Sequence, residues 1–294
     1  MIKYELVSNY RHDEKLKASF NDLAIETFGL DFRGWYNKGY WNDRYIPYSF
    51  VQGGKVIANA SIHKMSVLIN GQQLKGIQIG TVMTDEKYRH QGLAKQLMQH
   101  ILKEYEDACD FMYLFANDTV LDFYPKFGFT RIHESEFSLD LTEKPIPRRE
   151  DAIVRQLTIE QDLTLLENYA KNRHILSNIV DVEQNESLLM FYFTLVFQHA
   201  IYYLENLATI VLMEEEDGIL NIYDIISQQA INVEAVLASI VKQTTKKVVF
   251  YFTPNFAMDD MTATITPNDD DALFILSKNP LLQGNFMFPL TSHC

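Results

Sequence analysis

The chain of 294 residues has the length of about two domains. Hydrophobic residues make up 47% of it and charged residues 22%, which is typical of a folded globular protein and excludes wholesale disorder. The net charge is −13, whereas a general nucleic-acid binder needs clustered lysine and arginine. We therefore expect no nucleic-acid partner.

The sequence also lacks membrane and export features. No apolar run reaches the roughly 18 residues that a membrane helix needs, and the first residues contain no hydrophobic signal-peptide region. The two cysteines, Cys109 and Cys294, form neither a disulfide framework nor a metal-ligand spacing. These features favour a cytoplasmic protein without a membrane partner.

The first half of the chain alternates strand-like and helical patterns. Apolar residues recur at helical spacing over residues 13–28 and on one face of residues 92–108. The dipeptide Asn70-Gly71 between two strand-like stretches predicts a hairpin. In chain order we expect strands at 2–7, 45–51, 56–69, 75–84, 110–116 and 129–141, with helices at 13–28, 92–108 and, briefly, 117–124. The helix at 92–108 would connect two strands as a βαβ crossover.

A linker is expected at residues 145–150, where two prolines and a run of charges separate strand-like patterns. Beyond it the order of elements repeats loosely. We expect strands at 152–157, 208–213, 219–226 and 247–252, helices at 159–171, 186–197 and 233–242, and a hairpin turn at 214–218. The sequence thus predicts two domains, residues 1–144 and 145–294, in an α/β fold whose second half duplicates the first.

The stretch from Val82 to Ala94 is the most informative about chemistry. A strand ends near Thr84 and a helix begins at about Gly92, so consecutive backbone N–H groups lie at the positive end of a helix dipole. Gly92 allows a ligand to approach the backbone closely, and Arg89 adds a fixed positive charge. These features predict a pyrophosphate site, although a Walker lysine and a G-x-G-x-x-G fingerprint are absent.

Two segments of the first predicted domain resemble the GNAT superfamily of N-acetyltransferases. Arg89-x-x-Gly92-x-Ala94 is similar to the family's acyl-CoA signature, and it follows a valine-containing strand. Downstream, Asn117 and the run from Phe123 to Phe129 resemble the family's N-…-F-Y-x-K-x-G-F segment. The resemblance implies the GNAT acyltransferase fold, a mixed central sheet flanked by helices, and an acetyl-CoA-dependent N-acetyltransferase.

The same resemblance implies the site residues. Those expected to bind acetyl-CoA are Val82, Met83, Thr84, Arg89, His90, Gln91, Gly92, Leu93, Ala94, Asn117 and Tyr124. The strand at Val82 would splay from its neighbour, its amide would face the thioester oxygen as an oxyanion donor, and Tyr124 would protonate the leaving thiolate. A phenol with a pKa of about 10 keeps its proton at pH 7 and can donate it to a thiolate whose conjugate acid has a pKa of about 8.5. Because Cys109 has no histidine near it in sequence, we expect direct transfer to a primary amine without a covalent intermediate.

The sequence assigns no general base. Several family members place a carboxylate on the strand before the valine, but residues 76–80 contain no acid. Asp85 and Glu86 follow that strand, Asp31 and His63 are further candidates, and a water chain to backbone carbonyls is an equal alternative. The alternative function is a catalytically lapsed acyl-CoA-binding regulatory or scaffold protein.

The acceptor side is indicated by eight aromatic residues between positions 32 and 50, which would border the acceptor cleft of the resembled fold. They could hold a cation or an apolar amine, or they could cap the core and pack against the second half. The charge is −2 over residues 1–144 and −11 over residues 145–294, which tilts the choice toward a cationic small molecule. A peptide amine fits as well, so the acceptor stays unidentified.

The second half lacks a comparable cofactor signature. Residues 227–232 contain neither glycine nor arginine, so this half should be a degenerate copy that does not bind CoA. The acidic clusters at 214–217 and 269–271 lack the spacing of a calcium loop, and we expect no metal. The sequence leaves open whether the chain forms a homo-oligomer.

Overall fold

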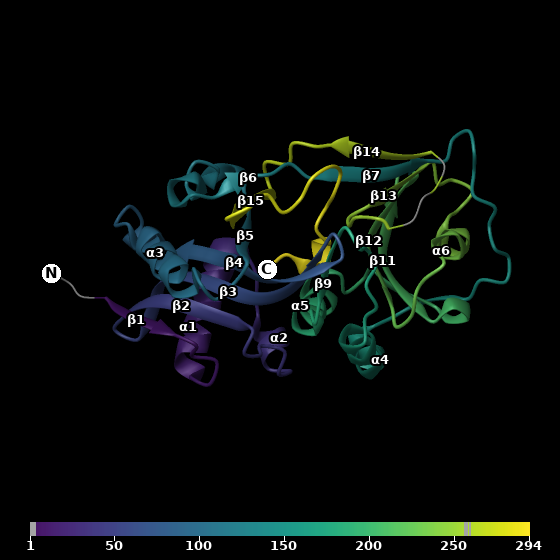
Figure 1. The fold of residues 1–294 in the computed structure, drawn as a ribbon. Helices are drawn as coiled ribbons and strands as arrows, with labels where there is room; N and C mark the ends of the chain where they lie inside the picture. Colours follow the sequence, from purple (N-terminus) through teal and green to yellow (C-terminus); the bar gives the residue numbers. More distant parts are fainter. Residues whose placement is uncertain (1–3, 256–257, 259) are drawn as a thin grey trace.

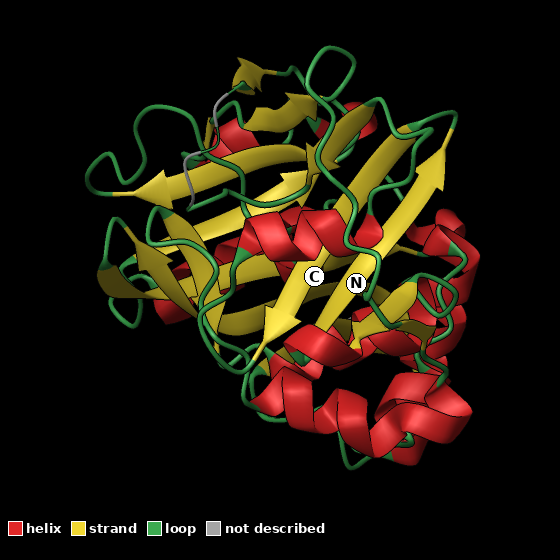
Figure 2. Ribbon diagram, turned by 90° about the vertical axis from the view of Figure 1, so that its right-hand side faces the viewer, coloured by secondary structure: helices red, strands yellow, loops and turns green. Residues whose placement is uncertain are grey.

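The computed structural model describes residues 4–255, 258 and 260–294. Two mixed β-sheets form its frame, one built mainly from the first half of the chain and one mainly from the second (Figure 1). Helices pack against these sheets (Figure 2), so the predicted mixed α/β class is confirmed. No helix in the described ranges is both long and apolar enough to cross a bilayer.

The elements have the following bounds. The first sheet, in spatial order, consists of β1 (Glu5–Ser8), β2 (Tyr45–Gln52), β3 (Lys55–Ile69), β4 (Gln72–Thr84), β5 (Phe111–Ala116), β15 (Ala272–Ser277) and β6 (Thr130–Arg131), with β9 (Val180–Glu183) paired to β3. The second sheet consists of β14 (Met261–Ile265), β7 (Ser135–Asp140), β13 (Lys247–Phe250), β12 (Ile219–Ser227), β11 (Thr209–Glu216), β10 (Ile201–Leu204) and β8 (Val154–Gln156). The α-helices are α1 (Glu14–Phe28), α2 (Arg33–Tyr36), α3 (Leu93–Tyr105), α4 (Ile159–Lys171), α5 (Glu186–Phe191) and α6 (Val233–Ile240). Short 3₁₀ turns are η1 (Glu86–Tyr88), η2 (Asp118–Val120), η3 (Tyr124–Phe127), η5 (Glu205–Leu207) and η6 (Leu290–Ser292), and η4 (Tyr192–Val196) is a π-helical turn.

The two sheets share one order of strands. In the first, the parallel neighbours β4 and β5 are joined through α3, and in the second β12 and β13 are the parallel pair joined through α6. The strand beside each parallel pair comes from the other half of the chain. β15 lies between β5 and β6, and β7 lies between β13 and β14. The predicted duplication therefore fits the fold, with one strand exchanged between the copies.

This exchange corrects the prediction of a single closing strand at residues 129–141. Its two pieces, β6 and β7, belong to different sheets. Phe137 and Leu139 of β7 are buried in the core of the second sheet, although their apolar alternation would suit either sheet equally. Each sheet contains strands from both sides of residue 144. The division into domains 1–144 and 145–294 therefore stays a prediction.

Two-residue turns set the hairpins. Asn70 and Gly71 adopt φ of 49° and 77° between β3 and β4, so the predicted hairpin is confirmed. In the second sheet the turn is only Asp217-Gly218, and the preceding glutamates belong to β11. The prediction of a turn over residues 214–218 was too long because Asp-Gly alone supplies the two positive φ angles that a tight hairpin needs. Residues 2 and 3 of the predicted first strand lie outside the described residues.

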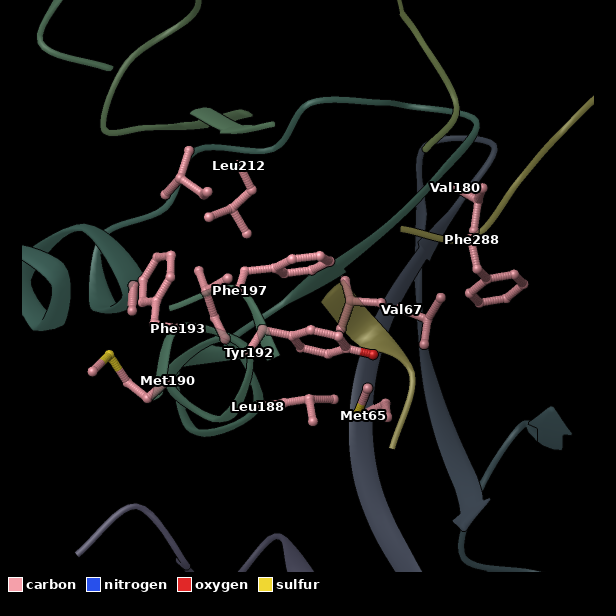
Figure 3. Packing of buried hydrophobic residues seen from close by; sticks show 14 of the residues in the cluster. Met65, Val67, Val180, Leu188, Met190, Tyr192, Phe193, Phe197, Leu212 and Phe288 are labelled. Carbon is pink, nitrogen blue, oxygen red and sulfur yellow. The ribbon is translucent and has the colours of Figure 1, made fainter. Parts of the chain in front are cut away.

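Helices cover both faces of the first sheet. α3 buries Leu97, Met98 and Ile101 against one face, and α1 packs on the other, beginning at Asp13, whose side chain accepts hydrogen bonds from two backbone amides of its first turn. α5 and η4 of the second half also pack on this other face. Figure 3 shows Tyr192 and its neighbours from this segment against Met65 and Val67 of β3. The face opposite α3 is therefore covered by residues from both halves of the chain.

Candidate functional site

β4 and β5 part beyond a short stretch of pairing. Their parallel register covers only Gly76–Gln78 and Phe111–Tyr113, which confirms the predicted divergence of these strands. A cavity of about 410 Å³ opens where they separate. Its lining includes the end of β4, the end of β5 and the first turn of α3, so it lies at the positive end of a helix dipole.

A β-bulge interrupts β4 at Thr81, whose φ is 50°, a rare value for a β-branched residue. Two hydrogen bonds fix Thr81. Its Oγ1 lies 2.7 Å from the Tyr45 hydroxyl, and its carbonyl oxygen accepts from Asn59 Nδ2 at 2.8 Å. Such a bulge re-aims the residue that follows, here Val82, which lines the cavity. This bulge could not be predicted from the sequence, since a threonine within a strand carries no bulge signal.

The predicted start of the helix at about Gly92 is confirmed, since α3 begins at Leu93. His90 and Gly92 adopt φ of 62° and 73°, and Gly92 caps the helix from a left-handed conformation. Within the described residues, no side chain caps this helix end and no atom lies within 4 Å of a Cβ built on Gly92. Arg89 Nε donates to the Thr84 carbonyl at 3.3 Å and so ties the turn to the end of β4. The first amides of α3 are therefore open to an anion.

Tyr124 begins η3 and lines the cavity. Its ring packs against Phe129 and against Phe274 of the exchanged strand β15, and only 5% of the residue is exposed. Burial raises the pKa of Tyr124 to about 12, so the phenol is protonated at neutral pH. No described residue hydrogen-bonds its hydroxyl, and an enclosed phenol of this kind can donate a proton to a ligand.

The structure brings about half of the expected cofactor residues to the cavity. Those lining it are Val82, Met83, Thr84, Ala94, Asn117 and Tyr124. Those in the turn and at the helix start, outside the lining, are Arg89, His90, Gln91, Gly92 and Leu93. Leu93 is buried in the core under α3, and Asn117 Oδ1 accepts from the Thr119 amide at 3.1 Å. The cofactor contacts of all these residues stay predictions.

Of the candidate bases, only His63 lines the cavity. Arg33 holds the Asp31 carboxylate, and Lys55 lies 2.7 Å from Asp85; these cations lower the pKa of both acids. Burial lowers the pKa of His63 to about 3, which keeps its imidazole neutral.

The second half of the chain supplies part of the cavity wall. Phe191 of α5 lines the cavity and stacks on Phe32 at 5.6 Å between ring centroids. Trp35 Nε1 donates to the Ser187 carbonyl at 2.7 Å and so fixes α5 against α2. Phe32 and Trp35 pack against the second half, as one interpretation of the aromatic stretch expected. They also line the cavity, but their role in holding an acceptor stays a prediction. The contribution of α5 could not be read from the sequence, which shows only a buried helix there.

The second sheet differs from the first at the corresponding position. Asn232 Oδ1 caps α6 by accepting from the Ala235 amide at 3.0 Å. Where β12 and β13 part, the Leu290 amide donates to the Tyr251 carbonyl and Thr291 donates to Asp224. The C-terminal segment therefore lies across the position that corresponds to the cavity of the first sheet. This arrangement supports the expectation that the second half does not bind CoA.

Comparisons with known proteins agree with this geometry. Residues 14–132 match the model of the acetyltransferase (GNAT) domain. Among solved structures, the chain is similar to a probable N-acyltransferase from Enterococcus faecalis, with 12% identity, a TM-score of 0.60 and 93% of this chain aligned to 72% of that one. It is also similar to Eis1 from Mycobacterium abscessus (11%, TM-score 0.58, 92% and 73%) and to a putative acetyltransferase from Pyrococcus horikoshii (13%, TM-score 0.50, 96% and 92%). At these low identities the structural similarity shows a shared fold alone. No curated protein matches the chain significantly.

Proposed function

Residues 14–132 form an acetyltransferase domain of the GNAT family, and from this premise we propose that the chain transfers an acetyl group from acetyl-CoA directly to a primary amine. The observation that carries the proposal is the cavity between the diverging strands β4 and β5, which combines open amides of α3 with the enclosed phenol of Tyr124. A pyrophosphate fits the helix terminus, and an extended pantetheine arm fits the strand edges that the divergence leaves unpaired.

Acetyl-CoA supplies the activated acyl group as a thioester, and this chain's residues bind and polarise it. The turn from Arg89 to Ala94 would hold the pyrophosphate through backbone amides. The bulge at Thr81 directs Val82 into the cavity, where its amide would hydrogen-bond the carbonyl oxygen as negative charge develops on it. Because hydrogen bonds from Tyr45 and Asn59 fix the bulge, this donor is held in place before the reaction.

Tyr124 would donate its phenolic proton to the departing thiolate. A pKa of about 12 keeps the phenol protonated at neutral pH, which is the form that a general acid needs. A cysteine nucleophile is not favoured at either cysteine. Burial raises the pKa of Cys109 to about 11, and this residue does not line the cavity. Cys294 does line the cavity, but burial raises the pKa of its thiol well above the ordinary value. These observations support direct transfer to the amine.

Calorimetry and one substitution test the proposal. Acetyl-CoA titrated into the purified chain should bind at one site, since the C-terminal segment lies across the corresponding position of the second sheet. Tyr124→Phe should retain the Kd for acetyl-CoA while kcat falls by about 10²–10⁴-fold. Tyr202→Phe, which removes a hydroxyl from β10 outside the cavity, is the matched control and should leave both constants unchanged.

The other outcomes are equally informative. Binding at one site without transfer to any amine would support the alternative of a lapsed acyl-CoA-binding scaffold. Two sites would contradict the degenerate second half. Failure of folded protein to bind acetyl-CoA would overturn the proposed activity.

A further inference from the structure

His63 is a buried polar residue in the cavity wall that has no role in the proposed transfer. We propose that His63 selects the acceptor: its Nε2 accepts a hydrogen bond from a hydroxyl group that the acceptor carries several bonds away from its reacting amine. The acceptor class is therefore an amino alcohol. This inference rests on the proposed acetyl transfer and leaves the reaction unchanged. An N–C bond forms as the C–S bond of acetyl-CoA breaks, the amine loses one proton, and the departing thiolate gains one.

The imidazole of His63 has no hydrogen-bond partner among the described residues. The residue is only 2% exposed, and it lines the cavity. Nδ1 is fully buried whereas Nε2 is not, so Nε2 is the ring nitrogen that a ligand in the cavity can reach. Burial lowers the pKa of His63 to about 3, and nearby Arg44 acts in the same direction, so the ring is neutral. A hydrogen bond from a ligand would remove the cost of leaving this buried ring unpaired.

The neighbouring polar side chains of the wall already have partners. Tyr45 lies opposite His63 in the pairing of β2 and β3, and its hydroxyl lies 2.7 Å from Thr81 Oγ1. Trp35 Nε1 donates to the Ser187 carbonyl at 2.7 Å. Among these three wall residues, His63 is therefore the one that keeps a hydrogen-bonding position for an acceptor.

The cavity also contains a carboxyl group. Cys294 lines it, with its main-chain carboxyl group beside Gly80. A second ammonium on the acceptor would pair with that group. A hydroxyl is the complement of the neutral ring of His63, because it can donate to Nε2 without a charge that must be desolvated. The proposal therefore separates a hydroxyl at His63 from an ammonium at Cys294.

Gln78 lies behind His63 and would fix its tautomer. The two residues are opposite each other in the pairing of β3 and β4, so their side chains share one face of the sheet. Neither polar atom of the Gln78 side chain has a partner among the described residues, and Gln78 does not line the cavity. Its amide oxygen can accept from Nδ1–H of His63, which leaves Nε2 as the acceptor for the hydroxyl.

The register of β3 and β4 sets the distance between the hydroxyl and the reacting amine. His63 pairs with Gln78, whereas Val82, whose amide is the proposed oxyanion donor, is level with the stretch between Asn59 and Ser61 of β3. About three residues of strand separate these two levels, which is about 10 Å. A nitrogen that attacks beside Val82 would lie short of His63, whereas a hydroxyl at the end of a short alkyl chain can reach it.

The test compares acceptors that differ only in one terminal group. The full chain and acetyl-CoA are assayed by release of free thiol with linear amino alcohols of about three to six carbons, the span that the strand register suggests. Each is compared with the alkylamine in which a methyl group replaces the hydroxyl, and with the diamine in which an amino group replaces it. At the best length, kcat/KM for the amino alcohol should exceed that for the alkylamine by at least about tenfold and should also exceed that for the diamine, since the alkylamine leaves His63 unpaired. Calorimetry with acetyl-CoA alone measures cofactor binding separately on the same preparation.

Substitutions then connect this preference with His63. His63→Phe should bring the ratio of kcat/KM for the amino alcohol to that for the alkylamine close to unity, with the Kd for acetyl-CoA within about twofold of wild type. His63→Gln keeps a neutral hydrogen-bonding group and should restore part of the ratio. Gln78→Met should lower the ratio at least about twofold in the wild type and leave it unchanged in His63→Phe, because Gln78 acts through His63. His199→Phe, at an exposed residue outside the lining, is the control and should leave the ratio unchanged.

Each contrary result is distinct. If the alkylamine equals the amino alcohol at every length, or if His63→Phe retains the preference, His63 does not bind the hydroxyl and the transferase proposal stands. If the diamine outperforms the amino alcohol, the second group is an ammonium and the acceptor class is wrong. If acetyl-CoA binds but no amine is acetylated, the proposed function fails and the acceptor class fails with it. The comparison in the wild type needs no substitution, so it decides the acceptor class even where a variant fails to fold.

Discussion

Replacing Glu134 by glutamine should make the protein more stable at pH 8 than the wild type. Glu134 lies between β6 and β7, where Oε1 accepts from the Phe288 amide at 2.7 Å. Burial is the largest cause that raises the pKa of Glu134 from 4.5 to about 7. Glutamine retains an acceptor for the Phe288 amide and cannot ionise. The variant therefore removes the cost of a buried charge while leaving the hydrogen bond in place.

The raised pKa fixes the sign and the size of the effect. Between pH 4.5 and about 7 the folded chain binds more protons at Glu134 than the unfolded chain does, so this group's contribution to stability falls as the pH rises through that window. The difference between the two pKa values corresponds to about 3 kcal/mol once the carboxylate is ionised in both states. His293 and Asp271, the titratable groups that face Glu134, are unchanged in the variant.

Urea unfolding of both proteins at pH 5 and pH 8 measures the effect. The free energy of unfolding of Glu134→Gln, relative to wild type, should rise by up to about 3 kcal/mol between these pH values. The exposed substitution Glu143→Gln is the matched control, with a difference from wild type that stays constant. A difference for Glu134→Gln that is equally constant across this range would refute the reasoning.

Three further predictions concern the ion-pair network, the acid and the cavity floor. Arg173 is buried between two aspartates at 2.9 and 3.1 Å, so Arg173→Met should lose about 3–5 kcal/mol of unfolding free energy in urea, and a loss below 1 kcal/mol would contradict this. Because the pKa of Tyr124 is raised to about 12, the pH profile of kcat should show no decline from deprotonation of this phenol between pH 7 and 10; a decline there that Tyr124→Phe abolishes would count against it. A Cβ on Gly80 would lie 2.3 Å from the Cys294 carbonyl oxygen. Gly80→Ala should therefore cost about 1–3 kcal/mol of stability and reduce acetyl transfer. An unchanged melting temperature and rate would show instead that the chain at Cys294 moves aside freely.

Features that depend on neighbouring residues could be predicted from the sequence. The hairpin at Asn70-Gly71 adopts the predicted conformation, because it depends on residues that tolerate positive φ. The helix at 92–108 corresponds to α3, and the divergence of β4 from β5 follows the expected family geometry. Local chemistry thus predicted the turn before α3, whereas the resemblance to the GNAT family placed Tyr124 at the site, and Tyr124 does line the cavity.

Features that depend on distant residues could not be predicted. The bulge at Thr81 is stabilised by Tyr45 and Asn59, which lie 36 and 22 residues away in sequence. Phe191 reaches the cavity because α5 packs on α2, and nothing in the local pattern of α5 distinguishes this contact from ordinary core packing. The sheet to which β7 belongs could not be predicted either. An apolar alternation shows that one face of the strand is buried, but it does not show which sheet the strand joins.

The exchange of β7 and β15 has a consequence for the order in which the protein is made. Chains usually fold domain by domain during synthesis, beginning at the N-terminus. Here β5 pairs along its whole length, from Phe111 to Ala116, with β15, which the ribosome adds more than 150 residues later. Until then the nascent first sheet exposes an apolar strand edge of the kind that aggregates. The acetyltransferase unit can therefore mature only after nearly all of the second unit has been translated, and a gene cut between the halves would encode two incomplete sheets.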